Sequence, residues 1–394
     1  MAYLEARNLT KIFGPNSADA LARLNAGLSK EQLLAETGHT VGLHRVSISV
    51  EKGEIYVVMG LSGSGKSTLI RHFNRLIDPD EGEILIDDED ILAMSLDQLG
   101  RLRREKMSMV FQRFALMPHR TVLDNVAYGL EVRGMSTQPR RARAMEWVET
   151  VGLTGFEHQF PSQLSGGMQQ RVGLARALCT DPEILLMDEA FSALDPLIRS
   201  QMQDELMSIQ ARLHKTIVFI SHDLDEALRL GDRIAILKDG ELVQVGTPAE
   251  ILLNPADAYV RAFVRDVNRA RVLKVRNLMA PVPLLLGDAP LAQALEAMRQ
   301  AGTDVGYIAD ANGYRGALVR SEVAEGAGGD QPVGAHMLRL PAIASEAILV
   351  DTLRETLSSR YPLPVVDERG ALAGVIARDS VVDALMPDDS AVEA

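Results

Sequence analysis

The chain has 394 residues and a formal net charge of −13 at neutral pH. This length exceeds one average domain of roughly 100–200 residues and favours two folded units. The acidic balance argues against a general nucleic-acid binder, which needs a basic face for phosphates. The single cysteine, Cys179, permits no internal disulfide and indicates a small buried hydrophobe in a reduced, cytosolic setting. The N-terminus lacks signal-peptide regions, and no apolar run approaches the roughly 18 residues of a spanning helix, so we expect no membrane crossing.

The first part of the chain predicts strands interrupted by helices. Residues 16–45 indicate an insertion of two short helices, the first capped by Ser17 and the second by a capping box at Ser29. Residues 46–59 indicate two short strands around a glycine turn, and residues 90–160 are largely helical in pattern.

Two apolar strands follow, with the sequences EILLMD (183–188) and TIVFIS (216–221), and a helical segment separates them. Apolar strands that alternate with helices are typical of a parallel sheet buried on both faces. The fold class is therefore predicted to be α/β, with a helical subdomain at about 90–160.

After Asn277 the chain repeats itself. The segments 307–323 and 364–381 align, with Gly316 matching Gly374, and an amphipathic helix precedes each. A twofold repeat of this kind predicts two small α/β modules packed on each other. The predicted boundaries are a linker at 266–276, modules at 277–331 and 332–386, and an acidic tail at 387–394.

The strongest chemical signal is a glycine-rich loop that follows a strand and opens a helix. Its pattern, G-x-x-x-x-G-K-[ST], is that of a phosphate-binding loop. The glycines let backbone N–H groups surround a triphosphate, and the helix N-terminus adds positive potential. Lys66 supplies a cation for the phosphates, and the Ser67 hydroxyl can ligate Mg²⁺. The residues of this loop are Gly60, Ser62, Gly63, Ser64, Gly65, Lys66, Ser67 and Thr68.

An apolar strand ends in two carboxylates, Asp188 and Glu189. Consecutive strand residues point to opposite faces, so the two side chains cannot perform the same task. One can face a metal ion, and the other can face the water that attacks a phosphate.

A second glycine motif narrows the class. Ser165 stands where a helix N-cap would, and Gly166 and Gly167 expose backbone N–H groups at the start of that helix. The segment LSGGMQ resembles the signature motif of ABC ATPases, which closes over the γ-phosphate held by a partner subunit. The resemblance implies a P-loop ABC cassette over residues 1–265, with ATP and Mg²⁺ as its ligands.

The resemblance assigns further roles by motif. Gln112 is similar to the family's Q-loop glutamine, which reaches the metal and couples to the membrane partner. His222 is similar to the switch histidine that contacts the γ-phosphate, and Asp195 belongs to a segment similar to the D-loop at the dimer interface. Phe13 resembles the aromatic that stacks on adenine, although a core or surface aromatic is the alternative. Within this family Glu189 is expected to be the general base, with Asp188, Ser67 and Gln112 on the metal.

Several longer segments, including the insertion at 16–45, look like the glycine betaine/proline (quaternary amine) importer ATPases. The resemblance implies a homodimer of ATPase subunits, transmembrane permease subunits and an extracytoplasmic solute-binding protein, with this chain peripheral on the cytoplasmic side of the inner membrane. The solute itself is not readable from any residue. An importer ATPase for another solute, a non-transport ABC ATPase and an inert regulatory cassette are the alternatives.

The C-terminal repeats resemble tandem CBS (cystathionine-β-synthase) modules, which implies regulation by ionic strength or a nucleotide. The positions that usually contact a ribose depart from the family pattern, since they hold Val319 and Glu322 in one module and Ala377 and Ser380 in the other. We therefore favour an ionic or structural role over nucleotide binding in these modules.

Overall fold

The computed structural model describes residues 2–112, 115–192, 194–323 and 329–386. The chain divides into two compact units, Met1–Val264 and Arg265–Ala394. In the described part, we find no helix with the length and apolar character that membrane crossing requires. The acidic tail expected at 387–394 lies outside the described residues.

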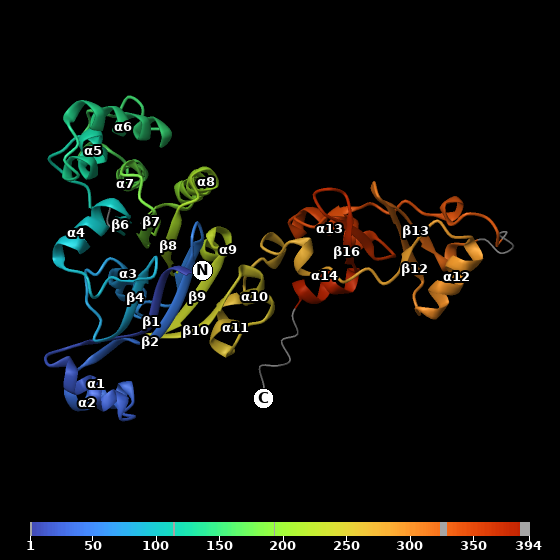
Figure 1. The fold of residues 1–394 in the computed structure, drawn as a ribbon, viewed down its shortest axis with the longest axis horizontal. Coiled ribbons are helices and arrows are strands. Elements are labelled where there is room, and N and C mark those ends of the chain that lie inside the picture. The colour runs from blue at the N-terminus through green and yellow to red at the C-terminus, as the bar shows by residue number, and fades with distance from the viewer. Residues whose placement is uncertain (1, 113–114, 193, 324–328, 387–394) are drawn as a thin grey trace. The chain divides into compact units, whose positions relative to one another are not determined.

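The first unit contains two sheets (Figure 1). The six-stranded sheet has the order β10-β9-β3-β8-β7-β6, and the four-stranded antiparallel sheet has the order β2-β1-β4-β5. The strands of the larger sheet are β3 (Ile55–Met59), β6 (Met107–Val110), β7 (Ile184–Asp188), β8 (Thr216–Ser221), β9 (Arg233–Lys238) and β10 (Glu241–Gly246). Those of the smaller sheet are β1 (Ala2–Phe13), β2 (Thr40–Glu51), β4 (Glu81–Ile86) and β5 (Glu89–Asp90).

The predicted parallel sheet is confirmed. β8 pairs in parallel with both β3 and β7, and every residue of these three strands is buried. Because both faces are covered, the strands are continuous apolar runs instead of alternating ones. Met59 lies level with Ser221, and Asp188 lies level with Ile220. The three strands therefore end at the same edge of the sheet, where the chemical groups follow.

Helices α3 (Lys66–Phe73) and α4 (Leu96–Glu105) pack in the core of these sheets. The core combines side chains from both sheets with Phe73 of α3 and Leu99 of α4. Each fully buried Leu or Phe side chain contributes roughly 1.5–3 kcal/mol. Residues 96–110 therefore belong to the sheet core and not to the helical subdomain predicted at about 90–160.

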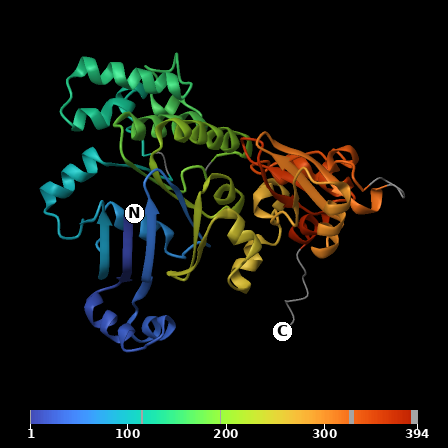
Figure 2. The ribbon, with the colours of Figure 1, turned by 45° about the vertical axis from the view of Figure 1, so that its right-hand side comes forward.

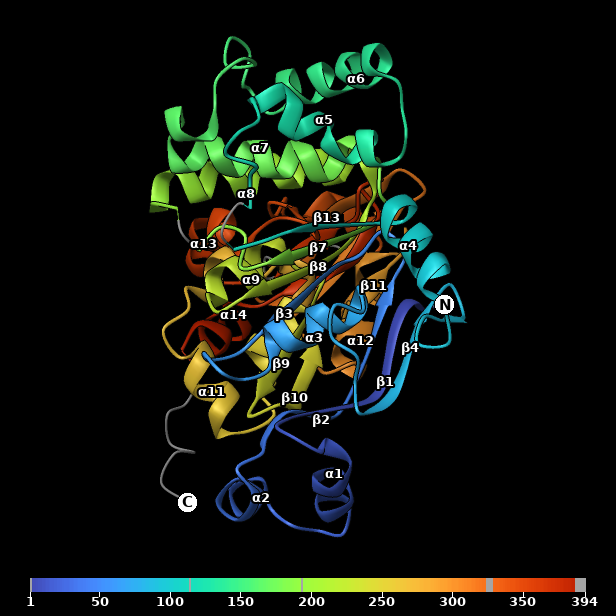
Figure 3. The ribbon, with the colours of Figure 1, turned by 90° about the vertical axis from the view of Figure 1, so that its left-hand side faces the viewer.

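The helical subdomain has its own core and lies at the opposite end of the first unit from α1 and α2 (Figures 1 and 3). Val126, Val148 and Val172 meet there, together with Cys179, which is fully buried as predicted. Its helices are α5 (Val122–Val132), α6 (Thr137–Thr150) and α7 (Gly166–Cys179). The other helices of the first unit are α8 (Pro196–Leu213), α9 (Leu224–Leu230), α10 (Pro248–Leu253) and α11 (Ala258–Val264).

The insertion forms two short helices, α1 (Ser17–Asn25) and α2 (Lys30–Thr37), as predicted. They extend from the ends of β1 and β2, shown in blue in Figure 2. Leu24 and Leu33 pack with Ile12 of β1 in a small separate core. The insertion is shorter than expected, because β2 begins at Thr40 and takes the residues up to 45.

The two predicted helix caps of the insertion have different outcomes. The Ser29 capping box is confirmed, since the Ser29 hydroxyl accepts a hydrogen bond from the backbone N–H of Gln32. The prediction that Ser17 caps the first helix is wrong. Asn16 in a left-handed conformation occupies the cap position, and the Ser17 hydroxyl donates instead to Oδ1 of Asp80 at 2.6 Å.

The second unit contains two three-stranded sheets with the same connectivity. In each sheet a short strand pairs in parallel with the middle strand, and the middle strand pairs antiparallel with the last. The first sheet contains β11 (Leu285–Leu286), β12 (Val305–Asp310) and β13 (Gly313–Val319), with α12 (Leu291–Gln300). The second contains β14 (Ile343–Ala344), β15 (Leu363–Val366) and β16 (Leu372–Ile376), with α13 (Leu349–Ser358) and α14 (Arg378–Leu385).

The segment that leads into each module pairs with the other module. Ala280 forms a bridge to Val375 of β16, and Leu338 forms a bridge to Ala317 of β13. This crossing explains the repeated glycine. A Cβ at Gly374 would lie 2.8 Å from the carbonyl oxygen of Ala280, so the leading segment could not pass there.

The stretch 266–276, predicted as an unpatterned linker, is instead packed within the second unit. Leu273 and Val275 are fully buried, and the Val275 amide donates a 3.0 Å hydrogen bond to the carbonyl of Ala347. The second unit therefore begins at Arg265 and not at 277.

Candidate nucleotide-binding and hydrolysis site

The glycine-rich loop connects β3 to α3, as the sequence indicates. Gly60, Gly63 and Gly65 have φ angles of 150°, 82° and 99°, which L side chains rarely adopt. A Cβ at Gly60 would lie 2.2 Å from the Leu237 carbonyl oxygen. The backbone conformation therefore favours glycine at all three positions, and at Gly60 and Gly65 a Cβ would also clash with a backbone oxygen.

The N-terminus of α3 is open to a ligand. Gly65 occupies the N-cap position and offers no side-chain hydrogen bond to the first turn. The backbone N–H groups there carry the positive end of the helix dipole. The Ser64 hydroxyl is buried and has no hydrogen-bond partner among the described residues. Because an unpaired buried hydroxyl is costly, this loop fits a ligand with acceptor oxygens, such as a phosphate. Ser62 and Gly63 are exposed, and Thr68 is partly buried in α3.

Lys66 is buried beneath this loop. Its ammonium group donates hydrogen bonds of 2.9 Å to the carbonyl oxygens of Gly60 and Leu61. Burial lowers the pKa of Lys66, while the negative charges of Glu189 and Asp188 act in the opposite direction. The ammonium therefore lies within the loop and within the field of both carboxylates.

The two adjacent carboxylates at the end of β7 contact different groups. Oδ1 of Asp188 accepts a 2.9 Å hydrogen bond from the Ser67 hydroxyl, and Oδ2 lies 3.6 Å from Nη2 of Arg71. Asp188 is only 5% exposed, so both contacts are largely shielded from water. Arg71 belongs to none of the sequence motifs, although its position one helical turn after Ser67 places both on one face of α3.

Glu189 contacts two other predicted residues. Its Oε2 accepts a 2.9 Å hydrogen bond from the Gln112 amide and lies 3.5 Å from Nδ1 of His222. Gln112 follows β6, Glu189 follows β7 and His222 follows β8. The side chains that come after three neighbouring strands therefore meet at one carboxylate oxygen. Glu189 also has a φ angle of +47°, which is uncommon for a residue with a side chain. Such positions are enriched at functional sites.

Phe13 lies close to the loop despite the insertion. It ends β1, pairs with Thr40 at the start of β2 and is 41% exposed. A Cβ at Gly42 would lie 2.6 Å from the Phe13 ring, and a Cβ at Gly65 would lie 2.5 Å from the Gly42 oxygen. The insertion therefore returns to the strand that it left, and Phe13 is not part of the core.

The second glycine motif starts α7, in the helical subdomain. The Ser165 hydroxyl accepts a 3.3 Å hydrogen bond from the Met168 amide, so the predicted N-cap is confirmed. Gly166 faces open space, while a Cβ at Gly167 would lie 2.7 Å from a methyl group of Ile198. Across the described residues, no recorded hydrogen bond or ion pair joins this motif to the loop at 60–68.

Asp195 caps the helix that packs against this motif. Its carboxylate accepts a 3.1 Å hydrogen bond from the Ile198 amide at the first turn of α8. The Asp195 cap and the glycine motif thus meet through Ile198, a residue that the sequence analysis did not select. Asp195 itself is exposed and does not contact the phosphate loop through any described hydrogen bond.

The fold and the site define a P-loop nucleoside triphosphatase whose helical subdomain carries a second glycine motif. Residues 43–192 match the family model described as ABC transporter. The chain is 46% identical to the glycine betaine transport ATP-binding protein OpuAA of Bacillus subtilis over 393 residues, which cover 99% of this chain and 94% of that protein. It is 47% identical to the glycine betaine/proline betaine transport system ATP-binding protein ProV of Escherichia coli, with 97% of each chain covered.

A solved structure extends the comparison. The dimeric structure of MJ0796, described as a bacterial ABC transporter cassette, matches with a TM-score of 0.53 and 34% identity, over 62% of this chain and 98% of that chain. The chain therefore belongs to the ABC transporter ATPases, in the family of the glycine betaine transport ATP-binding proteins.

Proposed function

We propose that this chain hydrolyses ATP to power the import of glycine betaine and related compatible solutes. The observation that carries the proposal is the convergence of Gln112 and His222 on one oxygen of Glu189, whose charge also acts on Lys66. The solute class rests on the names of OpuAA and ProV, which align with nearly the whole chain.

The loop at 60–68 would hold the phosphates of ATP. Its exposed backbone N–H groups, the unpaired Ser64 hydroxyl and the Lys66 ammonium are all suited to phosphate oxygens. Lys66 would exchange its loop carbonyl partners for phosphate. The exposed ring of Phe13, next to the loop through Gly42, would stack on the adenine.

Mg²⁺ would be held by Ser67, Asp188 and Gln112. In the described part of the chain, no group of three His, Cys, Asp or Glu side chains is arranged as a metal site. One carboxylate with neutral oxygen donors nevertheless suits Mg²⁺, which keeps several water and phosphate ligands. When bound, the ion neutralises charge that develops on the phosphates.

Glu189 would act as the general base. Its carboxylate accepts the proton of the attacking water, while Gln112 and His222 fix the orientation of the carboxylate. His222 would also contact the γ-phosphate. The rate acceleration then comes mainly from positioning and electrostatic stabilisation, as is usual for phosphoryl transfer.

A second copy of the chain would complete the site. Ser165, Gly166 and Gly167 form a helix N-terminus suited to an anion, but they belong to a different core from the loop that would hold ATP. A head-to-tail homodimer would place this motif of one subunit over the γ-phosphate of the other, with Asp195 at the interface. The solved relative MJ0796 is described as dimeric, which supports this arrangement.

The remaining partners follow from the transport role. Transmembrane permease subunits would receive the motion of the segment after Gln112, and an extracytoplasmic binding protein would deliver the solute. The chain would thus be peripheral, on the cytoplasmic side of the membrane. A non-transport ABC ATPase is the weaker alternative, because OpuAA and ProV are both named as transport proteins and both align over nearly their full length.

The second unit would regulate transport as a pair of CBS-like modules. The repeated sheets and their crossed leading segments support two related modules in one unit. One position expected to contact a ribose is already engaged, since Glu322 accepts a 2.7 Å hydrogen bond from the Tyr361 hydroxyl. This contact favours an ionic or structural role over nucleotide binding.

Uptake of labelled solutes tests the proposal. A strain that lacks this chain should lose osmotically stimulated uptake of glycine betaine, and the intact chain should restore it. Competition by unlabelled proline, choline and carnitine would then rank the solutes. Uptake that is indifferent to the deletion would overturn the importer assignment.

A further inference from the structure

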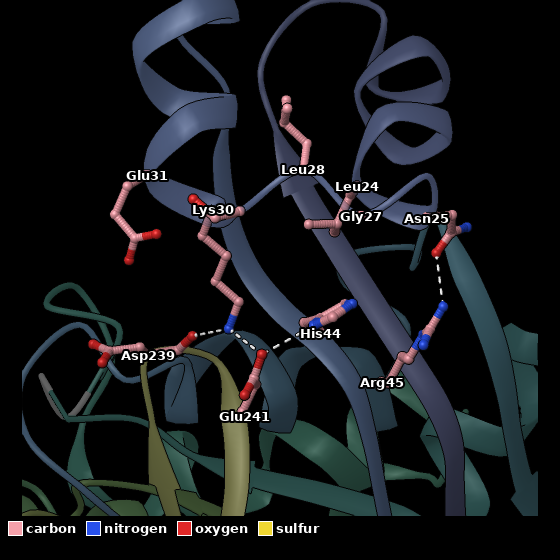
Figure 4. Close-up of a pocket in the computed structure, with 11 residues that line it drawn as sticks. Leu24, Asn25, Gly27, Leu28, Lys30, Glu31, His44, Arg45, Asp239 and Glu241 are labelled. Atoms are coloured by element: carbon pink, nitrogen blue, oxygen red, sulfur yellow. Dashed lines mark hydrogen bonds and ion pairs between the residues drawn. The ribbon is translucent and has the colours of Figure 1, made fainter.

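An open pocket of about 520 Å³ lies between the insertion and the turn that connects β9 to β10 (Figure 4). Three of the side chains that line it come from three different elements: Lys30 starts α2, His44 lies on β2, and Glu241 starts β10. Figure 4 shows Lys30 extended from α2 toward this turn, where its ammonium group meets Glu241.

Lys30 joins the insertion to the turn. Its ammonium group donates a 2.6 Å hydrogen bond to the Asp239 carbonyl oxygen and lies 2.7 Å from Oε1 of Glu241. The same Glu241 oxygen lies 3.0 Å from Nδ1 of His44. Partial burial tends to raise the pKa of Glu241, but the hydrogen bonds from Lys30 and His44 outweigh it and lower that pKa. The Glu241 carboxylate is therefore charged and shared by two donors.

The backbone of α2 fixes where Lys30 can reach. The Ser29 capping box sets the first turn of the helix, and Lys30 is its first residue. Leu33, on the same helix, is fully buried against β1 and the rest of the insertion. The side chain of Lys30 is 22% exposed and that of Glu241 is 52% exposed, so the Lys30 end of the ion pair is shielded from water and the Glu241 end is not.

The turn held by Lys30 supports the phosphate loop directly. The Gly240 amide donates a 3.1 Å hydrogen bond to the Ser64 carbonyl, and the Gly240 carbonyl accepts a 2.8 Å hydrogen bond from the His44 amide. Gly240 has a φ angle of +76°, and a Cβ there would lie 2.7 Å from the Gly42 oxygen. The turn, β2 and the loop are thus packed with no room for an extra atom.

We propose that Lys30 is a positioning residue for the phosphate loop, acting through Glu241 and the Asp239–Gly240 turn. This inference rests on the proposed function, because it assigns Lys30 to ATP binding by the loop. The basic side chains that line the pocket already have partners within it: Lys30 and His44 contact Glu241, and Arg45 donates a hydrogen bond to Oδ1 of Asn25. Such internal pairing is expected of a structural brace and not of a site that awaits a charged ligand.

Steady-state ATP hydrolysis by the full-length chain tests this role. In Lys30→Met the turn loses its ionic contact, so the phosphate loop is held less firmly in its binding geometry. The loop should then bind the phosphates of ATP less tightly, by the same factor in the ground state and in the transition state. The KM for ATP should therefore rise by about twofold to fivefold, while kcat changes by less than about twofold. Arg23→Met is the matched control, because Arg23 pairs with Asp19 and Glu36 inside the insertion and does not reach the turn. Its KM should equal that of the wild type.

Two further variants separate positioning from stability. Lys30→Arg keeps the charge and should restore most of the ATP affinity. Glu241→Gln should raise the KM for ATP as Lys30→Met does. The KM of the double variant should be no higher than that of the worse single variant, because both substitutions remove the same Lys30–Glu241 ion pair.

An unchanged KM in Lys30→Met, with or without a lower melting temperature, would overturn the proposal. An equal rise in Arg23→Met would do the same. If the wild-type chain fails to hydrolyse ATP, the proposed function fails instead, and direct binding of a fluorescent ATP analogue to the same variants still tests Lys30.

Discussion

The side-chain amide of Gln112 donates a 2.9 Å hydrogen bond to Oε2 of Glu189, although the two residues lie 77 positions apart. Glu189 adopts a left-handed backbone conformation, which costs on the order of 1–3 kcal/mol for a residue with a side chain. The surrounding structure must offset that cost. A carboxylate held in this way is aimed by its backbone as well as by its hydrogen bonds.

The first prediction concerns this carboxylate. Glu189→Gln should reduce ATP turnover by at least about 100-fold, because an amide cannot accept the proton of the attacking water. ATP binding should persist, and the variant should dimerise when ATP and Mg²⁺ are added. Phosphate release and light scattering measure the two effects. Asp204→Asn, in an exposed ion pair with Arg229, is the control and should keep wild-type turnover. Normal turnover in Glu189→Gln would refute the assigned base.

The second prediction concerns Gly65. Gly65→Ala would combine a positive φ angle with a Cβ 2.5 Å from the Gly42 oxygen. We expect the free energy of unfolding to fall by about 1–3 kcal/mol and ATP affinity to fall with it. Gly100→Ala is the control, since the added Cβ in α4 meets only the end of the Arg104 side chain, at 3.4 Å. That change should be neutral or stabilising by up to about 1 kcal/mol. Denaturant unfolding of both variants measures the difference.

These two sites show how far the sequence can predict the chemistry. The loop at 60–68 is contiguous, so its motif specifies its geometry directly. Gln112, Glu189 and His222 each follow one of three neighbouring parallel strands, and parallel strands of one sheet end at a common edge, so their convergence could be expected. The contact of Ile198 with Gly167 has no such signal, because it depends on how α7 packs on α8.

Other features were not predictable from local patterns. Ser17 resembles a helix cap, but Asp80 competes for its hydroxyl from 63 positions away. The stretch 266–276 looks like a linker because charged residues surround Leu273 and Val275. Its burial depends on a backbone partner, Ala347, that is distant in the chain. In both examples a long-range contact overrides the local sequence signal.

The third prediction follows from that packing. A chain that ends at Val264 should fold and retain ATP binding, because it stops at the boundary between the two units. A chain that ends at 276 should be less soluble, since it would expose Leu273 and Val275, which are fully buried in the intact protein. Size-exclusion chromatography of both proteins checks this. Equal behaviour of the two truncations would show that the segment is a free linker.

The fourth prediction concerns Cys179 in the helical subdomain. Burial raises the pKa of this thiol from about 9 to about 11. As the pH rises, the thiol of the unfolded chain ionises before the buried thiol of the folded protein does. Ionisation of Cys179 therefore lowers the free energy of unfolding between about pH 9 and about pH 11. Below about pH 9 the thiol has little effect on stability. A thiol reagent should label Cys179 at pH 8 only after denaturation. Rapid labelling of the native protein would contradict the burial of this residue. The Cys179→Ala variant should lose the thiol-dependent part of the alkaline destabilisation.

The most direct test of the account is whether hydrolysis at Glu189 drives solute uptake. Labelled glycine betaine uptake at high osmolarity should be measured in a strain without this chain, complemented with the wild type or with Glu189→Gln at equal expression. The account predicts that the wild type restores uptake and that Glu189→Gln leaves it at the level of the deletion. Full uptake with Glu189→Gln would contradict the claim that this carboxylate powers transport.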